Sequence, residues 1–159
     1  DVSAQAQQLE SLRLAPGAWS LAETGFAGQG EHLLKMAEKY DVPIDLALAM
    51  LWKESQWGTT GLSAQHNNPG NLKYVGQPGA HEAFTSPGAY GSFAGWPTME
   101  QGIEAYFQLL GTHYRQEIDS GNWEALVTRY APPSENDTGL YIQQVYDYAA
   151  TVRRHLGLE

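Results

Sequence analysis

Residues 43–73 read PIDLALAMLWKESQWGTTGLSAQHNNPGNLK and decide the fold of this chain. Their first half is apolar on every side of a helix, a pattern typical of a central helix buried by its neighbours. Pro43 lies in the first turn, where a missing N–H is tolerated, and Gly58 marks the predicted end. One carboxylate, Glu54, lies near that end, between two tryptophans and before an amide-rich turn. We expect the rest of the chain to build a cleft around it.

Glu54 follows Leu51, Met50 and Ala47 by three, four and seven residues, which places it on an apolar helix face. Burial disfavours the charged form of a carboxyl group and raises its pKa. The negative end of the helix dipole acts in the same direction. A carboxyl group that is protonated near neutral pH can act as general acid at a glycosidic oxygen. The alternative is an ordinary glutamate at a helix end, since acidic residues lie mostly on surfaces.

The remaining chain predicts an α+β fold that is predominantly α. Between residues 59 and 96, Asn, Gly, Pro and Ser alternate with short aromatic runs, which indicates a small β-lobe. We expect one domain over residues 1–159, with 1–27 as an N-terminal extension and 59–96 as the β-lobe insertion. Helical periodicity predicts helices over 3–14, 31–40, 43–58, from 98 onward, 122–130 and 138–156, and strands over 71–75, 81–85 and 90–93.

Composition excludes several classes of partner. The 159 residues carry 18 acidic and nine basic side chains, a formal charge of −9, which argues against binding nucleic acid or an anionic membrane surface. No cysteine is present, no apolar run approaches a membrane span, and the five histidines lack metal-ligand spacing. We therefore expect no metal, no cofactor and no membrane insertion. The chain begins at Asp1 without a signal-like segment, so a leader or an upstream domain could have been removed.

The run WKESQWGTTGLSAQHNNPGNLKY, residues 52–74, resembles the signature of the glucosaminidase-type peptidoglycan hydrolases, glycoside hydrolase family 73 of the lysozyme-like superfamily. ESQWG at 54–58 matches the helix end of that signature, and NN at 67–68 and LK at 72–73 match its continuation. FAGW at 93–96 and two later pairs, Tyr130-Ala131 and Tyr141-Ile142, extend the resemblance over residues 30–156. The chain also looks like the lysozyme-like domains of phage virion proteins and bacterial cell-wall effectors. It departs from the family where PGN at 69–71 replaces the usual apolar-Phe-Gly.

The resemblance implies a lysozyme-like helical domain with a small β-hairpin lobe, and it makes Glu54 the general acid. Glu82, on a predicted β-lobe strand, is the candidate general base, and Tyr130 is expected to face the acid. A wide carboxylate pair would invert the anomeric centre and a close pair would form a covalent intermediate. Attack by the substrate's own N-acetyl group would need one enzyme carboxylate only. The predicted substrate-binding residues are Trp57, Asn68, Asn71, Tyr74, Tyr90, Trp96 and Tyr141.

The resemblance favours an endo-β-N-acetylglucosaminidase that cleaves the β-1,4 glycan of peptidoglycan. A lytic transglycosylase or a muramidase could use the same Glu54. An alternative of another class is a non-catalytic glycan-binding or virion structural domain that keeps the fold. The implied partners are peptidoglycan glycan strands, bound by a monomer or by a module of a larger protein. Because peptidoglycan lies outside the cytoplasm, we expect an extracytoplasmic location: secreted, periplasmic or virion-borne.

Overall fold

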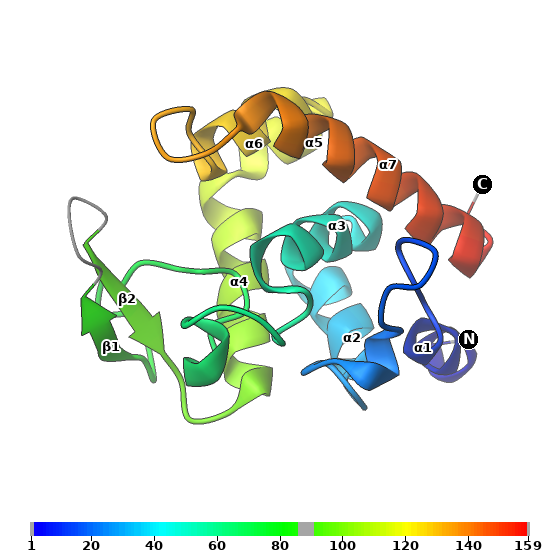
Figure 1. Cartoon of the computed structure of the whole chain (residues 1–159), viewed down its shortest axis with the longest axis horizontal. Helices are drawn as coiled ribbons and strands as arrows, with labels where there is room; N and C mark the ends of the chain where they lie inside the picture. The colour runs from blue at the N-terminus through cyan, green and yellow to red at the C-terminus, as the bar shows by residue number, and fades with distance from the viewer. Residues whose placement is uncertain (1, 86–90, 159) are drawn as a thin grey trace.

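The computed structural model describes residues 2–85 and 91–158 of the chain (Figure 1). Within these ranges it contains seven α-helices, two short 3-10 helices and one two-stranded sheet, which confirms the predicted α+β, mostly helical class. None of the described helices is both long and apolar enough to cross a bilayer. The elements are α1 (Val2–Glu10), η1 (Leu21–Glu23), α2 (Gly30–Tyr40), α3 (Ile44–Ser55), η2 (Ala64–His66), β1 (His81–Thr85), β2 (Ser92–Gly95), α4 (Met99–His113), α5 (Arg115–Ser120), α6 (Trp123–Tyr130) and α7 (Thr138–Leu156).

Helix α3 lies at the centre of the helical lobe, as its apolar sequence predicts (Figure 1). Nine of its 12 residues are buried, and α2 and α7 pack against it. It ends at Ser55, three residues before the predicted Gly58. The reason is local, because Gln56 and Trp57 both adopt left-handed backbone angles, with φ of 48° and 56°. This early end reverses the chain immediately after Glu54 and places Trp57 in the core.

The other predicted helices are present, some with shifted ends. The prediction for α7, residues 138–156, is confirmed at both ends. At the start of α4, the Thr98 hydroxyl accepts a hydrogen bond from the Gln101 backbone N–H at 3.2 Å and caps the helix. Helix α1 is shorter than the predicted 3–14, and α5 was not predicted.

The sheet of the β-lobe, residues 59–96, has two described strands where three were predicted. Strand β1 is confirmed at 81–85 and pairs antiparallel with β2, which lies two residues later than the predicted 90–93. The predicted strand 71–75 contributes one isolated bridge, between Lys73 and Phe93.

The β-lobe is attached to the helices at the start of α4. The Asn67 amide donates to the Trp96 carbonyl oxygen at 3.0 Å, and the Trp96 N–H donates to the His66 carbonyl oxygen at 3.0 Å. Gly102 in α4 allows the close approach, because a Cβ atom there would lie 1.8 Å from the carbonyl oxygen of Asn67. This contact fixes the β-lobe against α4.

Candidate active site

A cleft of about 480 Å³ lies between the helical lobe and the β-lobe, and Glu54 is one of its lining residues. The helical lobe contributes residues from the end of α3, the end of α6 and the loop before α7. The β-lobe contributes the turn after η2 and the facing sides of β1 and β2. Besides Glu54, the lining residues include Asn71, Lys73, Phe84, Phe93, Tyr130 and Glu135.

Two donors from distant parts of the chain hold the Glu54 carboxyl group. The Asn71 amide nitrogen donates to Oε1 at 2.8 Å and to the Glu54 carbonyl oxygen at 2.9 Å. The Tyr141 hydroxyl of α7 donates to Oε2 at 2.7 Å. Asn71 adopts a left-handed φ of 55°, a geometry that asparagine tolerates better than most residues. The acid is therefore fixed from both sides, with one edge at the cleft.

Burial raises the pKa of Glu54 above its ordinary value. The hydrogen bonds from Asn71 and Tyr141 and the positive charge of Lys53 lower it by less. The direction agrees with the one predicted from the apolar helix face. Glu54 therefore keeps its proton to a higher pH than a glutamate in water, which is what a general acid requires.

Three tyrosines lie near the acid: Tyr106 and Tyr141 are buried, and Tyr130 is half-buried. The pKa values of Tyr106, Tyr130 and Tyr141 are raised well above the ordinary tyrosine value, first by burial and then by the nearby negative charge of Glu54. All three therefore stay neutral and act as hydrogen-bond donors. The Tyr130 hydroxyl donates to the Gly70 carbonyl oxygen, so its proton is engaged and its lone pairs are what it can offer a substrate. Tyr130 does line the cleft with Glu54, as the resemblance predicts.

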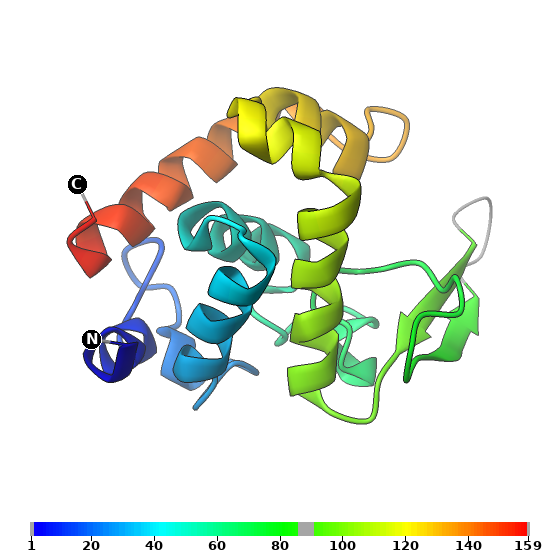
Figure 2. The ribbon, with the colours of Figure 1, turned by 180° about the vertical axis from the view of Figure 1, so that it is seen from behind.

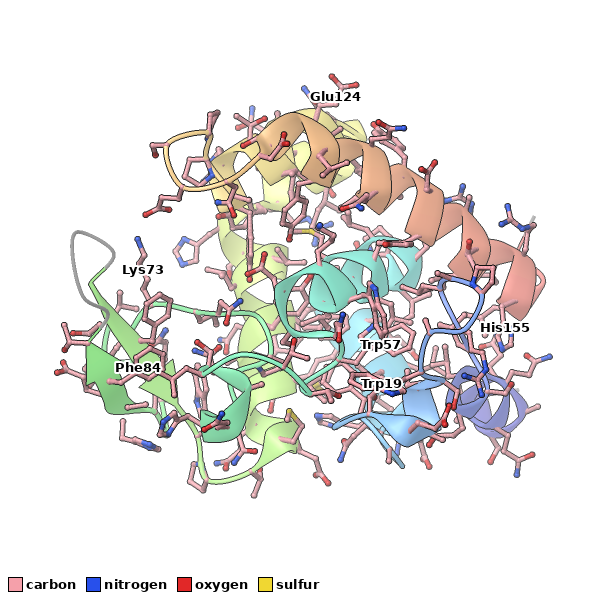
Figure 3. All side chains as sticks on the ribbon, viewed as in Figure 1. Trp19, Trp57, Lys73, Phe84, Glu124 and His155 are labelled. Carbon is pink, nitrogen blue, oxygen red and sulfur yellow. The ribbon has the colours of Figure 1, made fainter. Side chains whose placement is uncertain are left out.

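Two predicted substrate-binding residues are structural instead. The Trp57 side chain has no exposed surface, and its indole N–H donates to the Leu48 carbonyl oxygen at 3.0 Å. Asn68 is also fully buried, and its side chain donates to the carbonyl oxygens of Leu72 and Ala94 and accepts from the Leu72 amide, all at 2.9 Å. Neither side chain can contact a sugar, so the substrate-binding predictions for both are wrong. Figure 3 shows Trp57 near the centre of the molecule, away from the cleft.

We expect Asn68→Ala to lower the free energy of unfolding by about 3 kcal/mol or more, because three buried backbone groups would each lose a partner. Urea unfolding followed by circular dichroism measures the change. Asn136→Ala, at an exposed asparagine, is the matched control and should change stability by less than about 0.5 kcal/mol. An equally mild effect of Asn68→Ala would contradict the structural role.

The other predicted site residues differ in whether they line the cleft that contains Glu54. Tyr141 is 5% exposed and holds Glu54, so its predicted contact with substrate is corrected to a contact with the acid. Trp96 is 3% exposed and lines a second cavity, described below, and Tyr74 is half-buried and lines neither cavity. Tyr90 lies outside the described residues. Glu82 is exposed on β1 and is not among the residues that line the cleft.

Nine of the twelve described lining residues of the cleft were not predicted, and four of them have aromatic or charged side chains. Phe84 and Phe93 stack on each other, with ring centroids 5.1 Å apart, on the β-lobe side. Lys73 of the β-lobe, labelled in Figure 3, pairs with Glu135 in the loop before α7, with Nζ 3.7 Å from Oε1. The run PPSENDTG at 132–139, which contains Glu135, carries the only sequence signal for that residue. Among the described residues, no group of three or more His, Asp or Glu side chains could hold a metal ion.

A protein-family model for glucosaminidases, described as mannosyl-glycoprotein endo-β-N-acetylglucosaminidase, matches residues 30–154. The match begins at the first residue of α2 and ends inside α7, so it includes every residue that lines the cleft. The comparisons with curated proteins and with solved structures found no match. Because the matching model covers most of the chain and confirms the resemblance seen in the motifs, the chain belongs to the glucosaminidase family of glycan-cleaving enzymes.

Proposed function

We propose that this glycoside hydrolase is an endo-β-N-acetylglucosaminidase that cleaves the β-1,4 glycan of bacterial peptidoglycan, with Glu54 as general acid. One observation carries the proposal: a carboxyl group whose pKa burial raises lies in an interlobe cleft, held by Asn71 and Tyr141. Family membership supplies the reaction class, because glucosaminidases hydrolyse bonds of N-acetylated amino sugars.

The chemistry at Glu54 follows from its geometry. The proton of the carboxyl group passes to the glycosidic oxygen as the bond from that oxygen to the anomeric carbon breaks. The sugar keeps a partial positive charge until water, or first the substrate's own N-acetyl oxygen, forms the new bond. The ionised Glu54 that results keeps its two donors, Asn71 and Tyr141, which stabilise the negative charge as it develops. The water then gives up a proton, and Glu54 is reprotonated for the next cycle.

Unless the substrate's own N-acetyl group makes the first attack, activation of the water needs a second enzyme group, and two carboxylates compete for that role. Glu82 is the carboxylate that the family resemblance implies. Glu135, however, lines the cleft, and its loop is held in place. The Glu135 amide donates to the Pro132 carbonyl oxygen at 2.9 Å, and the Thr138 hydroxyl donates to the Ala131 carbonyl oxygen at 2.6 Å. We favour Glu135, because a general base must reach the attacking water.

We expect Glu135→Gln to lower the rate of hydrolysis by about a hundredfold and Glu82→Gln to lower it far less, since general-base catalysis contributes at least this factor. Initial rates on soluble glycan strands measure both. Azide added to Glu135→Ala provides a further readout, because it can replace the activated water and leave a glycosyl azide. A large loss with Glu82→Gln alone would assign the base to the β-lobe. Full activity of both variants would assign the role to the substrate's N-acetyl group.

Product analysis tests the proposed function itself. Mass spectrometry of fragments released from purified cell walls should show reducing N-acetylglucosamine ends. Reducing muramic acid ends would make the enzyme a muramidase, and anhydro-muramic acid ends would make it a lytic transglycosylase. A domain that only binds glycan would release no fragments.

The proposed substrate also determines where the protein works. Peptidoglycan lies outside the cytoplasm, so we propose an extracytoplasmic location, reached by secretion or as part of a virion, and a role in cell-wall degradation. The formal charge of −9 is compatible with an enzyme that leaves its substrate readily, since peptidoglycan stem peptides carry carboxylates. The chain would act there as a monomer or as a module of a larger protein.

A further inference from the structure

A second cavity, of about 750 Å³, lies beside α4 and is larger than the cleft that contains Glu54. Figure 2 shows α4 from behind, with the start of the β-lobe next to it. The helix has two distinct faces, as its periodicity requires. One face is buried in the core through Ile103, Tyr106, Phe107 and Leu110. The opposite face lines the cavity through Gln101, Ala105, Gln108, Leu109 and Thr112.

The opposite wall of this cavity is the segment 72–78, which is held in a defined conformation. Lys73 forms a bridge with Phe93 of β2. The Gln77 side chain accepts a hydrogen bond from the Val75 amide at 3.0 Å and donates to the Lys73 carbonyl oxygen at 2.8 Å. These bonds keep the segment folded on itself instead of against α4, so the space between them stays open.

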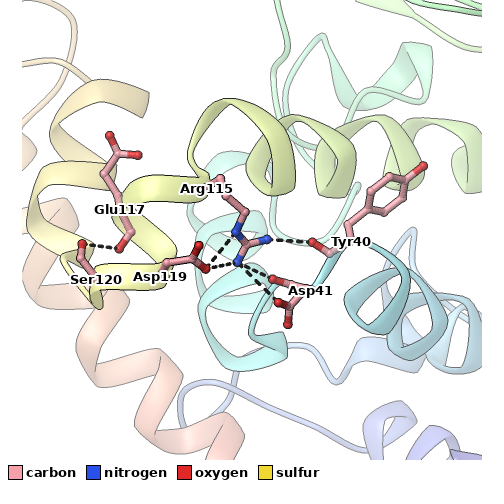
Figure 4. A network of polar contacts seen from close by, with 6 residues as sticks. All are labelled: Tyr40, Asp41, Arg115, Glu117, Asp119 and Ser120. Carbon is pink, nitrogen blue, oxygen red and sulfur yellow. Dashed lines mark hydrogen bonds and ion pairs between the residues drawn. The ribbon is translucent and has the colours of Figure 1, made fainter.

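Tyr40, at the end of α2, also lines the second cavity. Arg115 donates to the carbonyl oxygens of Tyr40 and Asp41, at 3.1 and 2.8 Å, and pairs with Asp119 (Figure 4). The Tyr40 hydroxyl donates to Glu104 at 2.7 Å. Because both its backbone and its hydroxyl are held, the Tyr40 ring is a fixed wall.

The second cavity and the cleft meet at one shared lining residue, Lys73. Asn71 lines the cleft, Leu72 lines the second cavity, and Lys73 between them lines both. One stretch of three residues therefore passes from the acid site to the second cavity. A linear polymer that lies against Asn71 beside Glu54 can continue past Lys73 along α4, provided that the Lys73–Glu135 pair opens to admit it.

The lining of the second cavity suits a neutral, polar ligand. Gln101, Gln108 and Thr112 offer amide and hydroxyl groups, and the Gln108 side chain makes no hydrogen bond to any other residue in the described part of the chain. Glu104 is already paired with Lys39 at 2.7 Å. Apart from Lys73, none of the described lining residues is a lysine or arginine, so the lining suits the neutral N-acetylglucosamine units of a strand better than its muramic acid units, which carry a lactyl carboxylate once the peptide is removed. Amides beside apolar surface match the acetamido and hydroxyl groups of amino sugars.

We propose that the second cavity binds N-acetylated amino sugars of a glycan strand while Glu54 cleaves a bond of that same strand in the cleft. The inference rests on the proposed function and extends it, since it makes the enzyme prefer long strands over short ones. Each additional hydrogen-bonded sugar should strengthen binding of the transition state, and two or three such bonds account for about a tenfold preference.

The test compares peptide-free glycan strands of four and eight sugars, prepared from cell walls with an amidase. For the unmodified enzyme, we expect kcat/KM to be about tenfold higher on the eight-sugar strand. Gln108→Trp fills the cavity with a side chain that a helix surface tolerates, and should lower this ratio to about one. Gln143→Trp, at an exposed glutamine on α7 that lines neither cavity, should leave the ratio at about ten.

Two outcomes would overturn the inference: a ratio near ten in Gln108→Trp, or a ratio near one in the unmodified enzyme. A four-sugar strand that keeps its stem peptides is the third substrate. If Gln108→Trp impairs only its cleavage, the cavity binds peptide and not sugar. Calorimetric titration of the Glu54→Gln enzyme with both peptide-free strands separates this inference from the proposed function. If the eight-sugar strand binds more tightly than the four-sugar strand and Gln108→Trp removes this difference, the second site is supported whether or not any strand is cleaved. If no strand is cleaved by the unmodified enzyme, only the glucosaminidase proposal is refuted.

Discussion

Replacement of Glu54 by glutamine should lower the rate of glycan cleavage about a thousandfold, because an amide cannot deliver a proton to the glycosidic oxygen. The substitution keeps the shape of the site. The amide oxygen can accept from Asn71 as Oε1 does now, and the amide nitrogen can donate to the Tyr141 hydroxyl, which accepts as readily as it donates. Initial rates on soluble glycan strands measure the loss. Glu124→Gln, at an exposed glutamate on α6, is the matched control and should retain full activity (Figure 3).

Stability measurements show whether such a loss is chemical or structural. The folded-state pKa of Glu54 is raised by burial, so the fold favours the protonated form. The enzyme therefore loses stability as pH rises from the ordinary glutamate pKa through the raised one, whereas Glu54→Gln carries no charge to lose or gain. At pH 7 the variant should unfold at a higher temperature than the unmodified enzyme. The difference should shrink as the pH approaches about 4. A variant that is both inactive and less stable at pH 7 would leave the catalytic assignment without support.

The central helix and its acid were predictable because both depend on local sequence. An all-round apolar helix must be buried, and a glutamate at its end, on the face of Ala47, Met50 and Leu51, is then partly buried with it. Helix α7 was equally predictable, since its apolar residues repeat at helical spacing over its full length. These patterns need no knowledge of what lies across the molecule.

The partners of the acid were harder to predict, because they depend on which segments meet in space. Trp57 and Asn68 belong to the same motif as Glu54, yet left-handed residues after α3 turn them inward, where they stabilise the fold. Tyr141 lies 87 residues after Glu54 and still contacts it directly. The family resemblance predicted Tyr141 to be a substrate-binding residue, but only the packing of α7 on α3 shows that it holds the acid.

The hydroxyl group of Tyr141 should control the pH dependence of catalysis. It donates to Glu54 Oε2 and thereby lowers the pKa of the acid, in opposition to burial. Tyr141→Phe removes this donor while the ring stays in place, so the pKa of Glu54 should rise further. Activity requires protonated Glu54 and falls as pH rises through that pKa. The alkaline limb of the pH–rate profile should therefore move to higher pH in the variant.

The same variant should have a maximal rate about ten- to a hundredfold lower, because the carboxyl group loses one of the two contacts that orient it. Tyr146→Phe, at an exposed tyrosine on the same helix, is the control and should change neither the limb nor the maximal rate. A lower rate with an unmoved limb would mean that Tyr141 only supports the packing of α7. An alkaline limb moved to lower pH would mean that the Tyr141 hydroxyl accepts a hydrogen bond from protonated Glu54 instead of donating one. The direction of the shift of the alkaline limb therefore reports whether the Tyr141 hydroxyl donates its hydrogen bond to Glu54 or accepts one from it.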